Sequence, residues 1–454
     1  MGLTREIGEF VAGMTFDKVP EKAVPIVVTG FTDCVGVTLA GLAEPVSPIV
    51  AKWVGFKGSL ADIARFEPTN LAAPDLALIL GTAAHALDFD DTAYNGHPSA
   101  VLVPAVLAEA QEVGADGQAM IAAYLAGYEI WGELTERESG TLHEKGWHPS
   151  AMYGTIAAAG ASAVLRGLDA DMATRAIGIA ASLAAGVIAN FGSMTKPFHL
   201  GRTAQSGLAA TRLAEAGLTS SPDAIEHDLG FLRAVSPLRE VDTTRPAVLG
   251  KTWHIFKQGI NVKLYPVCFG AHRLIDAMVG LRDSQGIDYR NIASVDAQVS
   301  ANSSKILRNS RPQTDLEAKF SAEFAVAAGA IAGRCGAEEV SNAFVLRPDV
   351  QALMGKVTVH PIHDKAQGDH SRSPFDWVEL TMSDGRRLVS EKIDYMRGHF
   401  KRGIERDVLW QKFSDCAAAM VDRQQALRLF ESLQDLPRLR SVGSLHPSLV
   451  SAAE

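Results

Sequence analysis

An acidic segment that follows a histidine is the strongest candidate for chemistry in this 454-residue chain. Residues 85–92 read HALDFDDT, and a helix running through them would place His85, Asp88 and Thr92 on one face. Carboxylates this close repel one another unless cations or hydrogen bonds compensate, and such surroundings shift pKa values as acid/base catalysis requires. On composition alone, a solvated acidic helix end is an equally good interpretation.

Two histidines precede Ala-rich apolar segments in the same tetrapeptide, HPSA. They are His97 and His148. Because proline is favoured in the first helical turn, we expect each imidazole beside a helix N-terminus, where free backbone N–H groups and the helix dipole attract an anion. Two such ends could hold two carboxylates. The tripeptide HPS recurs at His446 without evident purpose, so a simple helix-start signal is the alternative.

Three basic side chains lie close together ahead of a predicted helix at 203–216. They are Lys196, His199 and Arg202. Lys196 or Arg202 could neutralise a substrate carboxylate, and a desolvated lysine can also carry a proton. A solvated basic loop is the alternative.

A weaker group lies at the predicted domain boundary, where ligand clefts are common. It consists of Lys263, Tyr265 and His272. Other kinds of site are not signalled, because the chain has no GxGxxG after a strand, no GxxxxGK[ST] and no GxSxG. His143 and His148 resemble a zincin pair, but their i, i+5 spacing turns the second histidine off the shared face. We therefore predict no metal site and no nucleotide cofactor.

The elements that must position these residues fall into two predicted domains, because the chain is longer than one core usually holds. Up to residue 264 apolar residues recur at helical spacing, which predicts an all-helical domain. Its small Ala and Gly side chains should let helix axes approach closely. The clearest predicted helices span residues 20–42, 76–89, 118–134, 151–165 and 172–188.

Residues 265–399 have a different texture and predict a smaller α+β domain. β-branched stretches at 292–299 and 356–360 predict strands, and a hairpin is predicted at 377–389 with its turn at 383–385. Helices are predicted at 271–281 and 318–332. Residues 400–454 return to helical patterns, at 408–420 and 423–433, and should complete the first domain. The fold class is thus mainly α.

Composition restricts the possible partners. The formal net charge of −9 gives no basic footprint for nucleic acid or an anionic membrane, so a small anionic ligand is the expected partner. Four cysteines without CxxC spacing argue against a disulfide framework and suit a reducing cytoplasm. The N-terminus has no signal-peptide pattern, and we expect no apolar segment near the ~18 residues that a membrane span needs.

Taken in order along the chain, these motifs resemble those of the MmgE/PrpD family. The family includes 2-methylcitrate dehydratase, cis-aconitate decarboxylase and iminodisuccinate epimerase. The resemblance implies an all-helical domain with a smaller α+β lid, a homodimer, a site between the domains and no metal or iron–sulfur cofactor. It covers nearly the whole chain and rests on residues 33–37, 40–41, 88–92, 97–99, 148–149, 195–201, 263–266 and 317–321.

By matching positions, the resemblance assigns the active site to Asp88, Thr92, His97, His148, Lys196 and Lys263. We expect a cofactor-independent lyase, a dehydratase or decarboxylase, that acts on a small di- or tricarboxylic acid. The cations, with Arg202, would hold carboxylates, and the two histidines would exchange protons next to a carboxylate. Thr92, His199, Tyr265 and His272 would contact the substrate.

Two further functions use the same residues. An epimerase or isomerase of a dicarboxylate would place the two histidines on opposite faces of the substrate, and an inactive binding protein is the third possibility. Two departures from the family leave the substrate open. Only residues 93–96 separate Thr92 from His97, a shorter connection than in the dehydratases, and Glu323 lies in a segment where the family often has a hydroxyl.

Overall fold

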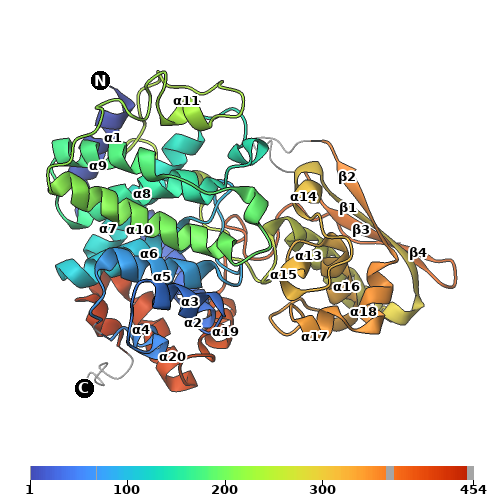
Figure 1. The fold of residues 1–454 in the computed structure, drawn as a ribbon. Coiled ribbons are helices and arrows are strands. Elements are labelled where there is room, and N and C mark those ends of the chain that lie inside the picture. Colours follow the sequence, from blue (N-terminus) through green and yellow to red (C-terminus); the bar gives the residue numbers. More distant parts are fainter. Residues whose placement is uncertain (1, 68, 365–372, 447–454) are drawn as a thin grey trace. The chain divides into compact units, whose positions relative to one another are not determined.

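The chain folds as the mainly α protein that its hydrophobic periodicity predicts (Figure 1). The structure, a computed structural model, describes residues 2–67, 69–364 and 373–446. It divides into two compact units: the first combines the chain up to Val262 with the part from Glu405 onward, and the second spans Lys263–Ile404. The predicted boundaries, at 264 and 400, differ from these by a few residues.

The first unit is built from helices. Its helix α10 packs against α5, α8 and α9, and α8 also packs against α7. The helices are α1 Leu3–Ala12, α2 Val24–Leu42, α3 Val46–Trp53, α4 Leu60–Ala64, α5 Ala73–His85, α6 Pro98–Val113, α7 Gly117–Thr135, α8 Pro149–Leu165, α9 Ala170–Leu183, α10 Thr195–Glu215, α11 Phe231–Val235, α12 Ile255–Gln258, α19 Arg406–Ala417 and α20 Arg423–Gln434.

Small residues set the close helix contacts, as predicted. A Cβ on Gly81 of α5 would lie 2.8 Å from the Cα of Gly201 in α10, and a Cβ on Gly207 would lie 2.5 Å from the Cβ of Ala158 in α8. Any larger side chain at these glycines would push the helix axes apart. The helix that carries Lys196 and the helix that begins after His148 are therefore held at short range.

Helix α2 overturns the expectation that no segment approaches a membrane span. By length and composition alone, the helical residues 21–42 are long and apolar enough to cross a membrane, with a mean hydropathy of 1.7 over an 18-residue window. However, 72% of that window is buried inside the protein. The helix packs against α5, α19 and α20 and buries Asp33. The C-terminal helices thus join the first unit, as predicted (Figure 1).

Buried hydrogen bonds attach the segment around His254 and Ile255 to helix α7. Glu129 accepts hydrogen bonds from the backbone N–H groups of His254 (2.7 Å) and Ile255 (2.9 Å). The imidazole of His254 lies 3.5 Å from Glu133 and 3.3 Å from Glu136. Burial alone would lower the pKa of His254, but hydrogen bonds to these two carboxylates outweigh it and raise the pKa to about 9.

This pKa predicts a loss of stability in mild alkali. A histidine whose pKa is raised on folding contributes stability that is complete below its ordinary pKa of 6.5 and disappears as the pH rises through about 9. We expect the Tm of the wild type to exceed that of His254→Gln most at pH 6 and the difference to shrink steadily towards pH 10. A pH-independent difference in calorimetry would contradict the prediction.

The second unit contains a four-stranded sheet in the order β2-β1-β3-β4. Strand β1 pairs parallel with β2 and antiparallel with β3, and β3 and β4 form the predicted hairpin. The elements are β1 Ile292–Ser300, β2 Val357–Ile362, β3 Trp377–Met382, β4 Arg387–Val389, α13 His272–Gln285, α14 Ala301–Ile306, α15 Asp315–Ala318, α16 Ala322–Ala332, α17 Asn342–Val345 and α18 Pro348–Met354.

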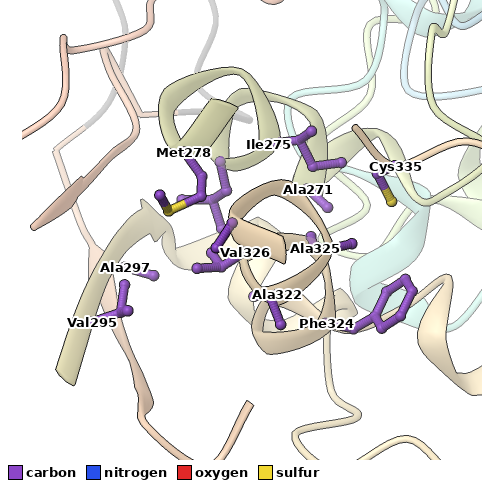
Figure 2. Close-up of a cluster of buried hydrophobic side chains, with 14 of the residues drawn as sticks. Ala271, Ile275, Met278, Val295, Ala297, Ala322, Phe324, Ala325, Val326 and Cys335 are labelled. Carbon is purple, nitrogen blue, oxygen red and sulfur yellow. The ribbon is translucent and has the colours of Figure 1, made fainter. Parts of the chain in front are cut away.

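The core of this unit lies between the sheet and two helices. Figure 2 shows Ile275 and Met278 of α13 and Val326 of α16 gathered with Val295 and Ala297 of β1. The alternation that points one face of β1 towards the helices is the period-two pattern from which the strand was predicted. The α+β character predicted for this region is confirmed.

Candidate active site

The acidic segment after α5 is not helical, so the prediction that His85, Asp88 and Thr92 share a helical face is wrong. Helix α5 ends at His85, and Asp88 adopts a left-handed φ of +52°. Two contacts explain the ending. His85 contacts Asp90 at 2.7 Å, which requires the chain to fold back, and Lys412 of α19 donates a hydrogen bond to the carbonyl of Phe89 at 2.7 Å. Tertiary contacts thus override local helix propensity.

A tight turn follows and accounts for the short connection between Thr92 and His97. Backbone hydrogen bonds link Ala93 and Gly96 in both directions, and φ is positive at Tyr94 (+49°) and Asn95 (+57°), as a type I′ turn requires. The tyrosine hydroxyl donates to the carbonyl of His254 at 3.1 Å. A buried interaction therefore stabilises a backbone conformation that is unfavourable for a bulky residue.

Thr92 pairs with Asn261, which follows the segment around His254 that is hydrogen-bonded to α7. Its backbone N–H and carbonyl pair with those of Asn261, and the Asn261 side chain also donates to the Thr92 carbonyl, at 2.8 Å. The Thr92 hydroxyl is buried and has no hydrogen-bond partner among the residues that the structure describes. It remains available for a ligand.

Both histidines of the HPSA motifs occupy helix N-caps, as predicted. His97 precedes α6 and His148 precedes α8, each followed by proline at the first helical position. The backbone N–H of His97 donates to the hydroxyl of Ser150 at 3.1 Å, which ties the two helix starts together. The ring centroids of the two histidines are 6.5 Å apart.

Asp90 bridges two imidazoles. One carboxylate oxygen lies 2.7 Å from Nδ1 of His85 and the other lies 2.8 Å from Nδ1 of His97. Burial would raise the pKa of Asp90, but the two histidines outweigh it and hold the pKa well below its ordinary value. Burial lowers the pKa of His85 to about 3, although Asp90 acts in the opposite direction. The arrangement at neutral pH is an ionised carboxylate between imidazoles.

Lys196 brings a cation to the same cluster. Its ammonium group lies 2.9 Å from Asp88, and Nε2 of His97 lies 3.9 Å from the other oxygen of that carboxylate. Both partners of the ion pair are almost fully buried. Helix α10 begins at Thr195, not at the predicted 203, so Lys196 lies in its first turn rather than in a loop.

His148, at the start of α8, contacts His199 of α10. Its Nδ1 lies 3.2 Å from Nδ1 of His199, and its ring packs edge-on against Phe191 with centroids 4.9 Å apart. Burial and the nearby lysine lower the pKa of His199 to about 4, and burial with the neighbouring cationic groups lowers the pKa of His148 well below its ordinary value. Two neutral rings in contact through Nδ1 must be opposite tautomers, because one donates and the other accepts.

The remaining predicted site residues fall into two groups. Arg202 is exposed on α10 and donates a hydrogen bond to Gln205 at 2.6 Å, so the structure does not bring it to the cluster. Lys263, Tyr265 and His272 belong to the second unit, where all three are buried. Their parts in catalysis or substrate contact stay predictions.

Two residues of the cluster lie in the acidic segment singled out from the sequence but were not assigned to the active site. They are Asp90 and His85, and the signal that could have identified them is the spacing in HALDFDD, which lets a histidine reach an acid five residues on once the chain turns back. A chain of aspartates offers no indication of which one faces a histidine. The backbone turn at Asp88 decides it.

The cluster also contains groups that bind metals. Donor atoms of His85, Asp88, Asp90 and His97 all lie within 4.8 Å of one another, and imidazole with carboxylate suits several transition metals. Two features oppose a cation here. The oxygens of Asp90 already contact both imidazoles, and the ammonium of Lys196 lies against Asp88. The cluster is better suited to an anion than to a metal ion.

This arrangement can bind a carboxylate and exchange protons with it. A buried ammonium and two helix N-termini supply positive potential, and neutral imidazoles supply proton donors and acceptors. All of these groups lie in the first unit and are positioned by α6, α8, α10 and the turn after α5.

Comparison with known proteins gives matches along most of the chain. The MmgE/PrpD N-terminal domain matches residues 5–244, and the MmgE/PrpD C-terminal domain matches residues 265–436.

Curated relatives match at low identity over long stretches. Cis-aconitate decarboxylase of Mus musculus is 26% identical over 387 residues, covering 82% of this chain and 77% of the relative. The human cis-aconitate decarboxylase is 22% identical over 453 residues, covering 96% and 92%. That of Aspergillus terreus is 24% identical over 490 residues, covering 98% and 95%.

Proposed function

Because this chain belongs to the MmgE/PrpD family, we propose that it is a lyase that removes CO2 or water from a small tricarboxylic acid by proton transfer next to a carboxylate. The relatives named above make decarboxylation of cis-aconitate the first reaction to test. The enzyme would work without a metal or an organic cofactor.

One observation carries the proposal: a buried lysine and two N-cap histidines surround the same position. The Lys196 ammonium lies 2.9 Å from Asp88, and His97 reaches the other oxygen of that carboxylate at 3.9 Å. His148 lies 6.5 Å from His97, measured between ring centroids. A lyase needs this combination, because it must stabilise a carboxylate while another group gives or takes a proton.

The proposed chemistry assigns each group one task. Lys196 and the N-termini of α6 and α8 hold substrate carboxylates and stabilise the negative charge that develops on the carbon skeleton. In decarboxylation the electrons of the C–C bond pass to the skeleton as CO2 leaves, and an imidazolium gives its proton to carbon. In dehydration one imidazole takes a proton from carbon, and a second group protonates the departing hydroxide.

A specific observation also favours a second candidate, a two-base epimerase or isomerase. His97 and His148 have separate hydrogen-bond partners, Asp90 and His199, so each could be prepared independently for proton transfer. Such an enzyme would remove a proton on one face of a carbon and return one on the other, without a leaving group.

One experiment separates these functions. The protein is incubated in D2O with cis-aconitate, citrate, 2-methylcitrate and iminodisuccinate, and each reaction is followed by proton NMR with CO2 measured in the headspace. New alkene signals, with CO2 or water released, identify the lyase. Deuterium entering the substrate without elimination identifies the epimerase or isomerase. No change in any substrate contradicts both enzymatic proposals.

A further inference from the structure

Asp90 constrains the position of a proton on His97. An ionised carboxylate only accepts hydrogen bonds, and its oxygen lies 2.8 Å from Nδ1 of His97. The backbone carbonyl of Asp91, which also only accepts, lies 3.2 Å from the same nitrogen. Two acceptors facing one ring nitrogen require that nitrogen to carry the hydrogen. In the neutral ring, Nε2 then has the free lone pair.

We propose that Asp90 is a positioning residue that keeps the proton of His97 on Nδ1 and so makes Nε2 of His97 the atom that exchanges a proton with the substrate. Nε2 of His97 lies 3.9 Å from Asp88, beyond hydrogen-bond distance, on the side of the ring where Lys196 pairs with that carboxylate. As far as the substrate is concerned, the inference rests on the proposed lyase or epimerase function.

The other oxygen of Asp90 explains why His85 is buried beside it. His85 is fully buried, and its Nε2 has no hydrogen-bond partner among the described residues. Its contact with Asp90 through Nδ1 therefore explains why a polar side chain is buried at this position. An imidazole nitrogen thus lies within 2.8 Å of each oxygen, and these two contacts restrain the orientation of the carboxylate. The rings of His85 and His97 also lie close, with centroids 4.3 Å apart.

The two candidate proton-transfer histidines are therefore not equivalent. His97 faces a carboxylate, which fixes its tautomer. His148 faces another imidazole, His199, which can either donate or accept and supplies no negative charge. We assign the substrate proton that moves to or from carbon to His97, which leaves His148 to serve the leaving group or the opposite face.

The test combines a tautomer measurement with a matched pair of variants. In the wild type labelled with 15N-histidine, two-dimensional NMR at a pH where the ring is neutral should show His97 protonated at Nδ1 and not at Nε2, with the assignment made by His97→Gln. Asp90→Asn should lower kcat on the order of 10²-fold, the lower end for general acid/base catalysis, with KM unchanged. The loss is partial because an asparagine oxygen still accepts one hydrogen bond.

Asp91→Asn is the control for changing a neighbouring buried acid. Burial and the nearby Asp33 raise the pKa of Asp91 well above its ordinary value, which favours an uncharged side chain and makes asparagine a close replacement. The part of Asp91 that contacts His97 is its backbone carbonyl, which asparagine keeps. This variant should keep the wild-type kcat. Equal losses of kcat in the Asp90 and Asp91 variants would mean that Asp90 has only a structural role, and would overturn the proposal.

The tautomer measurement needs no substrate. If the neutral His97 ring carries its proton on Nε2, the proposal is overturned. This conclusion holds whether or not the enzyme is active and whether or not Asp90→Asn folds. If His97 is protonated at Nδ1 but no polycarboxylate reacts, the assigned geometry is supported and the proposed function is the part that fails.

Discussion

Turnover is expected to fall on the order of 10⁴-fold when His97 or His148 is replaced by glutamine, the upper end for a group that transfers a proton. Glutamine keeps a polar side chain of similar reach but cannot take up or release a proton near neutral pH. In His97→Gln the amide N–H can still donate to Asp90, so the buried carboxylate keeps a donor and the Tm should change little. The measurement is kcat/KM together with thermal unfolding.

His446→Gln is the matched control. This histidine is the first residue of the third HPS tripeptide, but it lies 3.8 Å from Glu67 and not in the cluster. Its replacement should leave turnover unchanged. Full turnover in both His97→Gln and His148→Gln would exclude the assigned chemistry, whereas a loss in all three variants would indicate a general sensitivity of the protein to histidine replacement.

Replacing Lys412 with methionine is expected to lower the free energy of unfolding by about 3–5 kcal/mol, as for other buried ion pairs that lose one partner. The ammonium lies 2.5 Å from Asp33, and both side chains are almost completely buried. It also donates to the Phe89 carbonyl. Methionine fills similar space but leaves the aspartate charge uncompensated. Urea unfolding followed by tryptophan fluorescence, to which Trp410 on the same helix contributes, measures the loss.

Two further variants isolate the cause. Arg406 lies on the same helix as Lys412, and Arg406→Met removes an exposed ion pair with Glu431 of α20. This change should lower the free energy of unfolding by about 1 kcal/mol or less. Adding Asp33→Asn to Lys412→Met removes the uncompensated charge and should restore part of the loss. If the double variant is no more stable than Lys412→Met, the destabilisation does not arise from the buried charge.

The helix starts of the site could be predicted because their signals are local. Proline after His97 and His148 marks the first helical position, and α6 and α8 begin there. Residues 118–134 were predicted as a helix and α7 spans Gly117–Thr135, because its hydrophobic pattern agrees with its tertiary contacts. Where local and tertiary preferences agree, sequence patterns suffice.

Helix ends and side-chain directions were harder to predict. The sequence pattern continues α5 to Phe89, but Lys412, 323 residues away in sequence, binds that residue's carbonyl and the helix stops at His85. The helix after Lys196 was predicted to begin at 203, yet a proline in the first turn of a helix costs no hydrogen bond, and α10 starts before Pro197. At about 100° per residue, Arg202 then points roughly 120° away from Lys196.

The contact between Lys412 and Phe89 also links the site to the timing of synthesis. The acid/base residues of the cluster leave the ribosome long before this lysine, which follows Phe89 by 323 positions and comes after the entire second unit. At ~5–20 residues per second, the delay is roughly 16–65 seconds. During that time the nascent chain contains Asp33 without its counterion and the acidic turn without the hydrogen bond from Lys412 to the Phe89 carbonyl. The acidic turn therefore gains its contact with Lys412 only when α19 has been made. A chain that terminates before α19 would contain every proposed proton-transfer group but would lack this contact.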